Sequence, residues 1–148
     1  MRTPLPLAFL CLIFPISSCD SKPAASATSR PSAHVLYSAE DAFTFEGPPD
    51  LVQIPTRGID SFVGEYRSPT MKVSFDFGWY SSPLKRKGDN VRKMIINGES
   101  ATLVTKPKHF AIHFPDIQKS GNKLTMDVKL NGADPKEAEN LLLSIRFR

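Results

Sequence analysis

Residues 71–77 read MKVSFDF and residues 124–130 read LTMDVKL. In both stretches every second side chain is apolar, and the side chains between them are polar. Successive side chains of a β-strand point to opposite faces of a sheet, so each stretch predicts a strand with one buried face. Residues 110–114, FAIHF, follow a similar alternation. The fold is therefore predicted to be built on a sheet that is covered on one side.

Turn signals between the strands predict antiparallel pairing. Asn97 and Gly98 stand between two apolar runs, and this dipeptide is typical of the type I′ turn of a tight hairpin. A second turn, at residues 120–122, is expected to join the two later alternating strands. Residues 43–45 and 51–54 are expected to form shorter strands that end before prolines.

The C-terminal residues change from a strand period to a helical one. Asp134 can cap a helix, and Pro135 suits its first position. An apolar stripe at helical spacing follows, formed by Ala138, Leu141, Leu142 and Ile145. Residues 146–148 can leave the helix to form a last strand. The predicted fold class is α+β: a mostly antiparallel sheet of five to seven strands with a C-terminal amphipathic helix packed on it.

The N-terminal residues have the order of features found in exported lipoproteins. Arg2 supplies a positive start, and residues 5–16 are apolar apart from two prolines. This run is too short for a membrane-spanning helix, which needs about 20 residues. Residues 16–19, ISSC, resemble the lipobox of bacterial lipoproteins. The resemblance implies cleavage before Cys19 and attachment of diacylglycerol to its sulfur.

The domain boundaries follow from this start. Residues 1–18 are predicted to be a lipoprotein signal peptide, residues 19–34 an acylated cysteine with a disordered tether, and residues 35–148 a single α+β domain. Residues 20–33 are mostly serine, alanine and proline and cannot bury enough apolar surface to fold. The domain is expected in the cell envelope, on the periplasmic or extracytoplasmic side of a membrane. Asp20 resembles an inner-membrane retention signal whose rule differs between bacterial groups, so inner and outer membrane both stay open.

The composition is that of an ordinary globular protein. The chain has 148 residues, of which 41% are hydrophobic and 23% charged, and this excludes collagen-like, coiled-coil and wholly disordered chains. Cys11 lies in the predicted signal and Cys19 carries the lipid, so no disulfide, thiolate metal site or cysteine nucleophile is expected in the domain. Loss of Arg2 lowers the net charge from +4 to +3, too modest to indicate nucleic-acid binding.

Three features together suggest a known fold: an opening strand at residues 43–45 with its proline turn, alternating strands in the middle, and the closing residues 142–147, LLSIRF. This order resembles the PsbP-like fold, an antiparallel sheet covered by helices. The resemblance implies accessory, assembly or binding roles and no single active site. Residues 57–66 and 75–81 are also similar to a signature of uncharacterised bacterial envelope proteins, and that similarity implies no activity.

The candidate binding surface is the loop that follows two aromatic residues, Trp79 and Tyr80. Five cations lie within nine residues of this loop, namely Lys85, Arg86, Lys87, Arg92 and Lys93. An acidic protein surface, anionic lipid or another polyanion would attract them. The segment from Asp60 to Tyr66 is taken as a further part of this surface. A plainer interpretation, a solvated loop that keeps the protein soluble, stays open.

Two other patterns are interpreted as structural. His109 and His113 share a face of a predicted strand, where four residues span roughly 13 Å, too far for two ligands of one ion. Both are expected to be solvated, and neither a metal nor a cofactor is predicted. Asp60 and Ser61 have the juxtaposition of some hydrolases, but no nucleophile elbow surrounds them, and a turn explains them.

The leading hypothesis is a lipid-anchored bacterial cell-envelope protein that binds another envelope protein as a non-enzymatic binding or accessory module. An immunity or inhibitor lipoprotein is one form of it. The first alternative is an envelope hydrolase that uses Asp60, Ser61, Glu65 or Asp76. The second alternative is a carrier of a small apolar ligand, with a pocket lined by Phe75, Phe77, Trp79 and Phe114. The sequence leaves the partner and the oligomeric state open.

Overall fold

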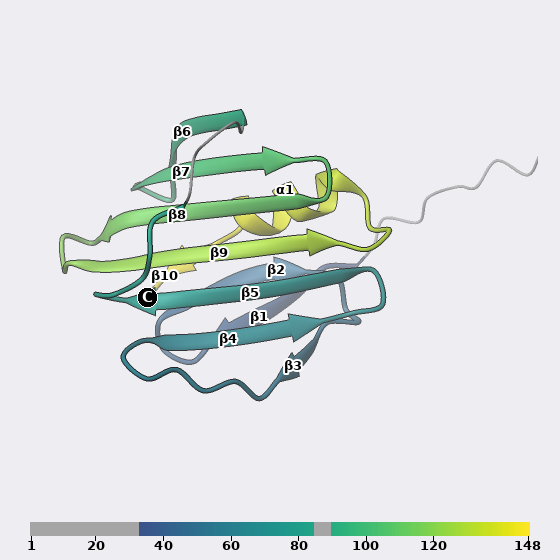
Figure 1. Ribbon diagram of the computed structural model, residues 1–148, viewed down its shortest axis with the longest axis horizontal. Coiled ribbons are helices and arrows are strands. Elements are labelled where there is room, and N and C mark those ends of the chain that lie inside the picture. Colours follow the sequence, from purple (N-terminus) through teal and green to yellow (C-terminus); the bar gives the residue numbers. More distant parts are fainter. Residues whose placement is uncertain (1–32, 85–89) are drawn as a thin grey trace, which may run out of the picture. The chain divides into compact units, whose positions relative to one another are not determined.

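The computed structural model describes residues 33–84 and 90–148, which form ten strands and one helix (Figure 1). The strands are β1 (Val35–Ala39), β2 (Phe43–Gly47), β3 (Val52–Ile54), β4 (Phe62–Arg67), β5 (Met71–Gly78), β6 (Asn90–Ile96), β7 (Glu99–Lys106), β8 (His109–Ile117), β9 (Asn122–Leu130) and β10 (Arg146–Phe147), and the helix is α1 (Pro135–Leu143). The predicted signal peptide, Cys19 and most of the predicted tether lie outside the described residues, as do Lys85, Arg86 and Lys87.

Seven strands form one antiparallel sheet in the order β3-β4-β5-β9-β8-β7-β6. At its centre β5 pairs with β9 along its whole length, so the two stretches that predict the sheet lie side by side. Their apolar side chains share one face, where Val73 lies opposite Val128 and both are fully buried. The strict alternation of these two strands therefore defines the covered face of the sheet.

The predicted hairpins are confirmed. Asn97 and Gly98 join β6 to β7 with φ angles of 50° and 89°, the positive values that a type I′ turn requires. The second hairpin joins β8 to β9 as predicted. Its turn comprises residues 118–121, and Asn122 already belongs to β9.

A second layer covers one face of the large sheet. β1, β2 and β10 form a separate three-stranded sheet, which lies with α1 behind the large sheet in Figure 1. Phe43 of β2 packs on Phe75 of β5 with ring centroids 5.0 Å apart, and Phe147 of β10 packs on Phe114 of β8 at 4.9 Å. The mostly antiparallel architecture is confirmed. The single sheet of five to seven strands is corrected to a sheet of seven and a sheet of three, in a largely β domain with one short helix.

The predicted C-terminal helix is confirmed. Asp134 caps α1 by accepting a hydrogen bond from the backbone N–H of Lys136 at 2.8 Å, and Pro135 is its first residue. After the helix, the hydroxyl of Ser144 accepts a hydrogen bond from the backbone N–H of Glu46 in β2 at 2.7 Å. Among the described residues, no helix is long and apolar enough to cross a membrane.

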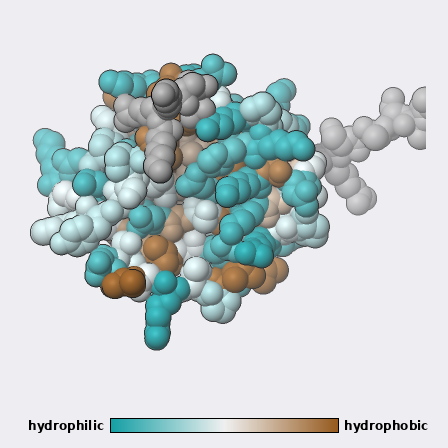
Figure 2. Space-filling view, in the orientation of Figure 1, coloured by the Kyte–Doolittle hydropathy of each residue, from teal (hydrophilic) through white to brown (hydrophobic). Residues whose placement is uncertain are grey.

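The opposite face of the large sheet, called the outer face below, carries the connection between β5 and β6. Three strands separate β5 from β6, so this connection has to cross the sheet. Residues 79–84 leave β5 and pass over the outer face (Figure 1). Figure 2 looks onto this face, where hydrophilic side chains predominate and smaller apolar patches lie between and around them.

Candidate functional site

Trp79 and Tyr80 stand exposed where β5 ends. Gly78 closes the strand with a φ of 138°, a conformation that favours glycine. The two side chains that follow are 66% and 74% exposed. Rings of this size usually bury most of their apolar area, so an adjacent exposed pair marks a surface that can gain from being covered.

The loop before β4 lies beside this pair. A methyl group on Gly78 would lie 3.5 Å from the Cβ atom of Ser61, so the loop and the end of β5 are neighbours. The same loop presents the exposed Asp60, and the side chain of Ile59 is 98% exposed. The term aromatic end is used below for Ile59, Asp60, Trp79 and Tyr80. Ile59 was not predicted, because a single isoleucine inside a turn has no periodic signal.

Tyr66, predicted to bind a partner, belongs to the core. Its side chain is 3% exposed, and its ring packs on that of Phe45 with centroids 5.3 Å apart. Its hydroxyl donates a hydrogen bond to the backbone carbonyl of Ser38 in β1 at 3.2 Å. Burial raises the pKa of this hydroxyl. Tyr66 is therefore corrected from a surface residue to one that joins the two layers.

Arg92 and Lys93 point to opposite sides of β6. Arg92 forms an ion pair with Glu139 of α1 and so lies toward the covered face. Lys93 lies on the outer face, opposite Thr102 of β7. The two cations therefore do not form one patch. Lys93 belongs to the outer face, while Arg92 links the last strand of the sheet to the helix.

Thr125 of β9 is the centre of a buried polar network on the outer face. Its hydroxyl donates to the backbone carbonyl of Ser82 at 2.7 Å, and the hydroxyl of Ser81 lies 3.0 Å from it. The Nδ1 atom of His113 lies 2.8 Å from the same oxygen. A hydroxyl has one proton to donate, so Ser81 and His113 must donate to Thr125, which places a proton on Nδ1 of His113. This network fastens residues 81 and 82 to the sheet.

The burial of His113 corrects a prediction. The side chain was expected to be solvated, but it is 4% exposed, and it lies beside Thr125, to which Ser81 and Ser82 are hydrogen-bonded. Thr125 was not predicted as its partner. The turn at residues 118–121 could not give this pairing, because it sets Ile117 opposite Asn122, and a β-bulge between Phe114 and Ile117 then shifts the register by one residue and brings Thr125 opposite His113.

A second polar pair, His109 and Asp127, lies beside this network. The Nε2 atom of His109 is 2.6 Å from Oδ1 of Asp127, and both side chains line a hollow of about 300 Å³ bordered by residues 82–84. A hollow of about 240 Å³ shares Asp127 and includes Asp76, whose Oδ1 atom is buried without a hydrogen-bond partner among the described residues.

Within residues 33–84 and 90–148, no group of three or more His, Cys, Asp or Glu side chains is placed to hold a metal ion.

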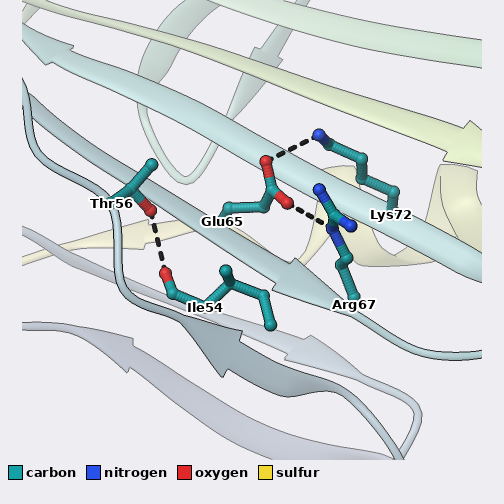
Figure 3. Close-up of polar contacts among 5 residues, drawn as sticks. All are labelled: Ile54, Thr56, Glu65, Arg67 and Lys72. Carbon is teal, nitrogen blue, oxygen red and sulfur yellow. Dashed lines mark hydrogen bonds and ion pairs between the residues drawn. The ribbon is translucent and has the colours of Figure 1, made fainter.

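Glu65, a candidate of the hydrolase hypothesis, is bound by two cations (Figure 3). Its carboxylate accepts a hydrogen bond from Lys72 Nζ at 2.6 Å and another from Arg67, and its side chain is 13% exposed. The hydrogen bond from Lys72, followed by that from Arg67, holds the pKa of Glu65 below its ordinary value. A carboxyl group kept ionised in this way is a poor proton donor and a weak base.

The four residues proposed to line a ligand pocket do not meet in one cavity. Phe75 and Phe114 are 5% and 0% exposed and pack inside the core, between the two layers. Phe77 is half-buried, and Trp79 lies outside the core at the aromatic end. The carrier hypothesis therefore has no assembled site among these four residues.

No protein-family model matches the chain, and no curated protein matches it significantly. The described residues define a class by architecture alone, a two-layer and largely antiparallel β domain with one C-terminal helix. The similarities to a lipobox and to the PsbP-like fold stay predictions.

Proposed function

We propose that the aromatic end is the binding surface of a lipid-anchored bacterial cell-envelope protein, which binds another envelope protein and catalyses no reaction. The exposure of Trp79 and Tyr80, 66% and 74%, carries this proposal. Tryptophan and tyrosine are enriched at the energetic centres of protein interfaces, because each buries a large apolar area and keeps a polar group for hydrogen bonding. A partner that covers them would remove that area from water.

The charge that follows Trp79 and Tyr80 in the sequence favours an acidic partner surface. Residues 85–87, Lys-Arg-Lys, follow the aromatic pair closely in the sequence. Complementary charge on a partner accelerates encounter and disfavours basic competitors. An inhibitor that blocks a toxin or hydrolase delivered into the envelope is one concrete form of this function.

The predicted lipid anchor supplies the location. Acylation at Cys19 would hold the chain on a membrane, and residues 20–33 would let the domain move within roughly 20 Å of it by the square-root rule for flexible chains. A partner in the same compartment would then be met at a raised local concentration.

A photo-crosslinking amino acid at position 80, in the full chain expressed in its own cells, tests the binding surface. The matched control carries the same group at Leu36, an apolar residue of β1 that is 62% exposed. We expect one discrete crosslinked product from position 80 and none from position 36. Trp79→Ala in the same chain is expected to reduce the product, because it removes the neighbouring contact.

The outcomes are distinct. Equal products from both positions would indicate nonspecific contact, and no product from position 80 would refute the aromatic end as a binding surface.

Cys19→Ala tests the anchor separately, since it is expected to abolish metabolic acyl labelling and to release the protein from membrane fractions. Acyl labelling that persists in this variant would refute the anchor at Cys19.

A further inference from the structure

β6 forms one edge of the seven-stranded sheet (Figure 1). Its hairpin with β7 has a two-residue turn, so the flanking residues Ile96 and Glu99 exchange both backbone hydrogen bonds. Such pairs alternate along an antiparallel ladder. Counting back from the turn, the backbone N–H and C=O groups that point away from β7 are those of Val91, Lys93 and Ile95. No strand in the described part of the chain occupies that side of β6.

The side chains of the same three residues lie on the outer face and alternate in kind. Val91 is 39% exposed and Ile95 is 75% exposed, with Lys93 between them. A hollow of about 510 Å³ lies beside them, lined by Lys93, Ile95, Thr102 and Pro115 among others. β6 contains two cations and no acidic residue. The edge therefore offers backbone groups that no described strand pairs, together with apolar area and positive charge.

We propose that β6 accepts an extended acidic segment of a partner protein as an eighth strand of the large sheet. Three N–H and three C=O groups of β6 would bond the backbone of that segment. An acidic side chain opposite Lys93 would form a cross-strand ion pair. Apolar side chains opposite Val91 and Ile95 would cover their exposed area, and one of them can enter the hollow. The recognised pattern is apolar, any residue, acidic, any residue, apolar.

Charge favours this occupant over a second copy of the chain. Two β6 strands paired about Lys93 would place like charges directly opposite each other, which is unfavourable. The other edge of the sheet is less suited, because β3 has only three residues and Pro55 follows it. The β6 surface and the aromatic end share no residue, so this inference does not depend on the proposed function.

Selection of the full chain against a displayed library of peptides of about nine residues tests the proposal, with affinities then measured by fluorescence anisotropy. The selected peptides are expected to share the predicted pattern. Lys93→Glu should weaken the acidic peptides by about tenfold or more and favour versions with lysine at the central position. Lys129→Glu, at an exposed position of β9, is the matched control and should change affinity less than about twofold.

Backbone pairing is tested on both partners. Lys93→Pro removes an N–H that does not bond β7, so the sheet should persist while peptide affinity falls by about tenfold or more. In the bound peptide, every second backbone N–H group points toward β6. Methylation of these nitrogens should abolish binding, whereas methylation of the intervening nitrogens should not. Binding that tolerates both methylation patterns, binding unaffected by Lys93→Glu, or a library that gives no binder would overturn the proposal. The Lys93→Glu and peptide arms keep it testable if Lys93→Pro does not fold.

Discussion

The ring of Phe75 fills the space that a side chain at position 64 would occupy, since a methyl group on Gly64 would lie 2.3 Å from two carbons of that ring. The two residues lie opposite each other in β4 and β5, on the covered face. Phe43 and Phe62 pack on the same ring with centroids 5.0 and 5.2 Å away. The ring can therefore move only if its neighbours move, and the core requires glycine at position 64.

Gly64→Ala is expected to destabilise the protein by about 1 to 3 kcal/mol, the usual cost of overpacking a core. Urea unfolding of the variant beside the wild type measures this cost. Phe75→Leu also destabilises, but it makes room at position 64. The double variant should then lose less stability than the two single losses together. Strictly additive losses would show that the ring and position 64 do not interact.

Thr125→Val tests the polar network on the outer face. Valine keeps the shape of threonine but removes the hydroxyl that Ser81, Ser82 and His113 share. Because a buried polar group left unpaired costs about 1 to 3 kcal/mol, and the buried hydroxyl of Ser81 loses its partner, we expect a loss of about 1 to 3 kcal/mol. Ser81→Ala removes one hydrogen bond of the same network and should cost less. A smaller loss for Thr125→Val than for Ser81→Ala would contradict the network.

Glu65→Gln should change how stability depends on pH. The pKa of Glu65 is lower in the folded protein than its ordinary value of 4.5, so its stabilising effect is fully present above pH 4.5 and is lost as the pH falls through the lowered pKa. Wild type should therefore be more stable than the variant near neutral pH, and this advantage should shrink below pH 4.5. Urea unfolding between about pH 7 and pH 3 measures it. An advantage that stays constant with pH would exclude the assigned pairing with Lys72 and Arg67.

Tyr66→Phe should act at the other end of the pH range. Burial raises the pKa of Tyr66 above 10.0 in the folded protein, so its contribution is fully present below pH 10.0 and is lost as the pH rises through the raised pKa. The variant should lose less stability than wild type in alkali. At neutral pH it lacks the hydrogen bond to Ser38 and should be less stable by about 0.5 to 1.5 kcal/mol. Thermal unfolding at neutral pH and above pH 10.0 checks whether the variant is less stable than wild type at the first pH and loses less stability at the second.

The central strands and the helix could be predicted because each carries a local signal. β5 and β9 alternate strictly, and α1 has a cap, an initial proline and an apolar stripe. β4 carries a weaker signal, because Gly64 interrupts the alternation of Phe62 and Tyr66 at the position where Phe75 supplies the missing side chain. Two strands of the small sheet were predicted, at residues 43–45 and 146–148, but β1 and the separate sheet were not, because the pairing of the two-residue β10 with β2 depends on where α1 places it.

The candidate surface was predictable only where sequence neighbours decide exposure. Trp79 and Tyr80 follow a strand end and precede a basic loop, so their exposure could be anticipated. The burial of His113 could not, because it depends on a connection that crosses the sheet to reach β6. Arg92 and Lys93 lie on opposite faces of the sheet. Strand geometry gives this result once residues 90–96 are known to form β6.

The pairing of β10 with β2 constrains the order in which the protein can fold during synthesis. The backbone N–H of Glu46 can bond the hydroxyl of Ser144, 98 residues later in the chain, only after that residue has been synthesised. In the same way, Thr44 can pair with Arg146 only after β10 has been synthesised. A nascent chain that is synthesised or exported from its N-terminus presents Phe43 and Phe45 long before these partners emerge. The second layer, formed by the three-stranded sheet and α1, can be completed only after synthesis has passed residue 146. Chaperones that recognise apolar segments can act on the chain during that interval.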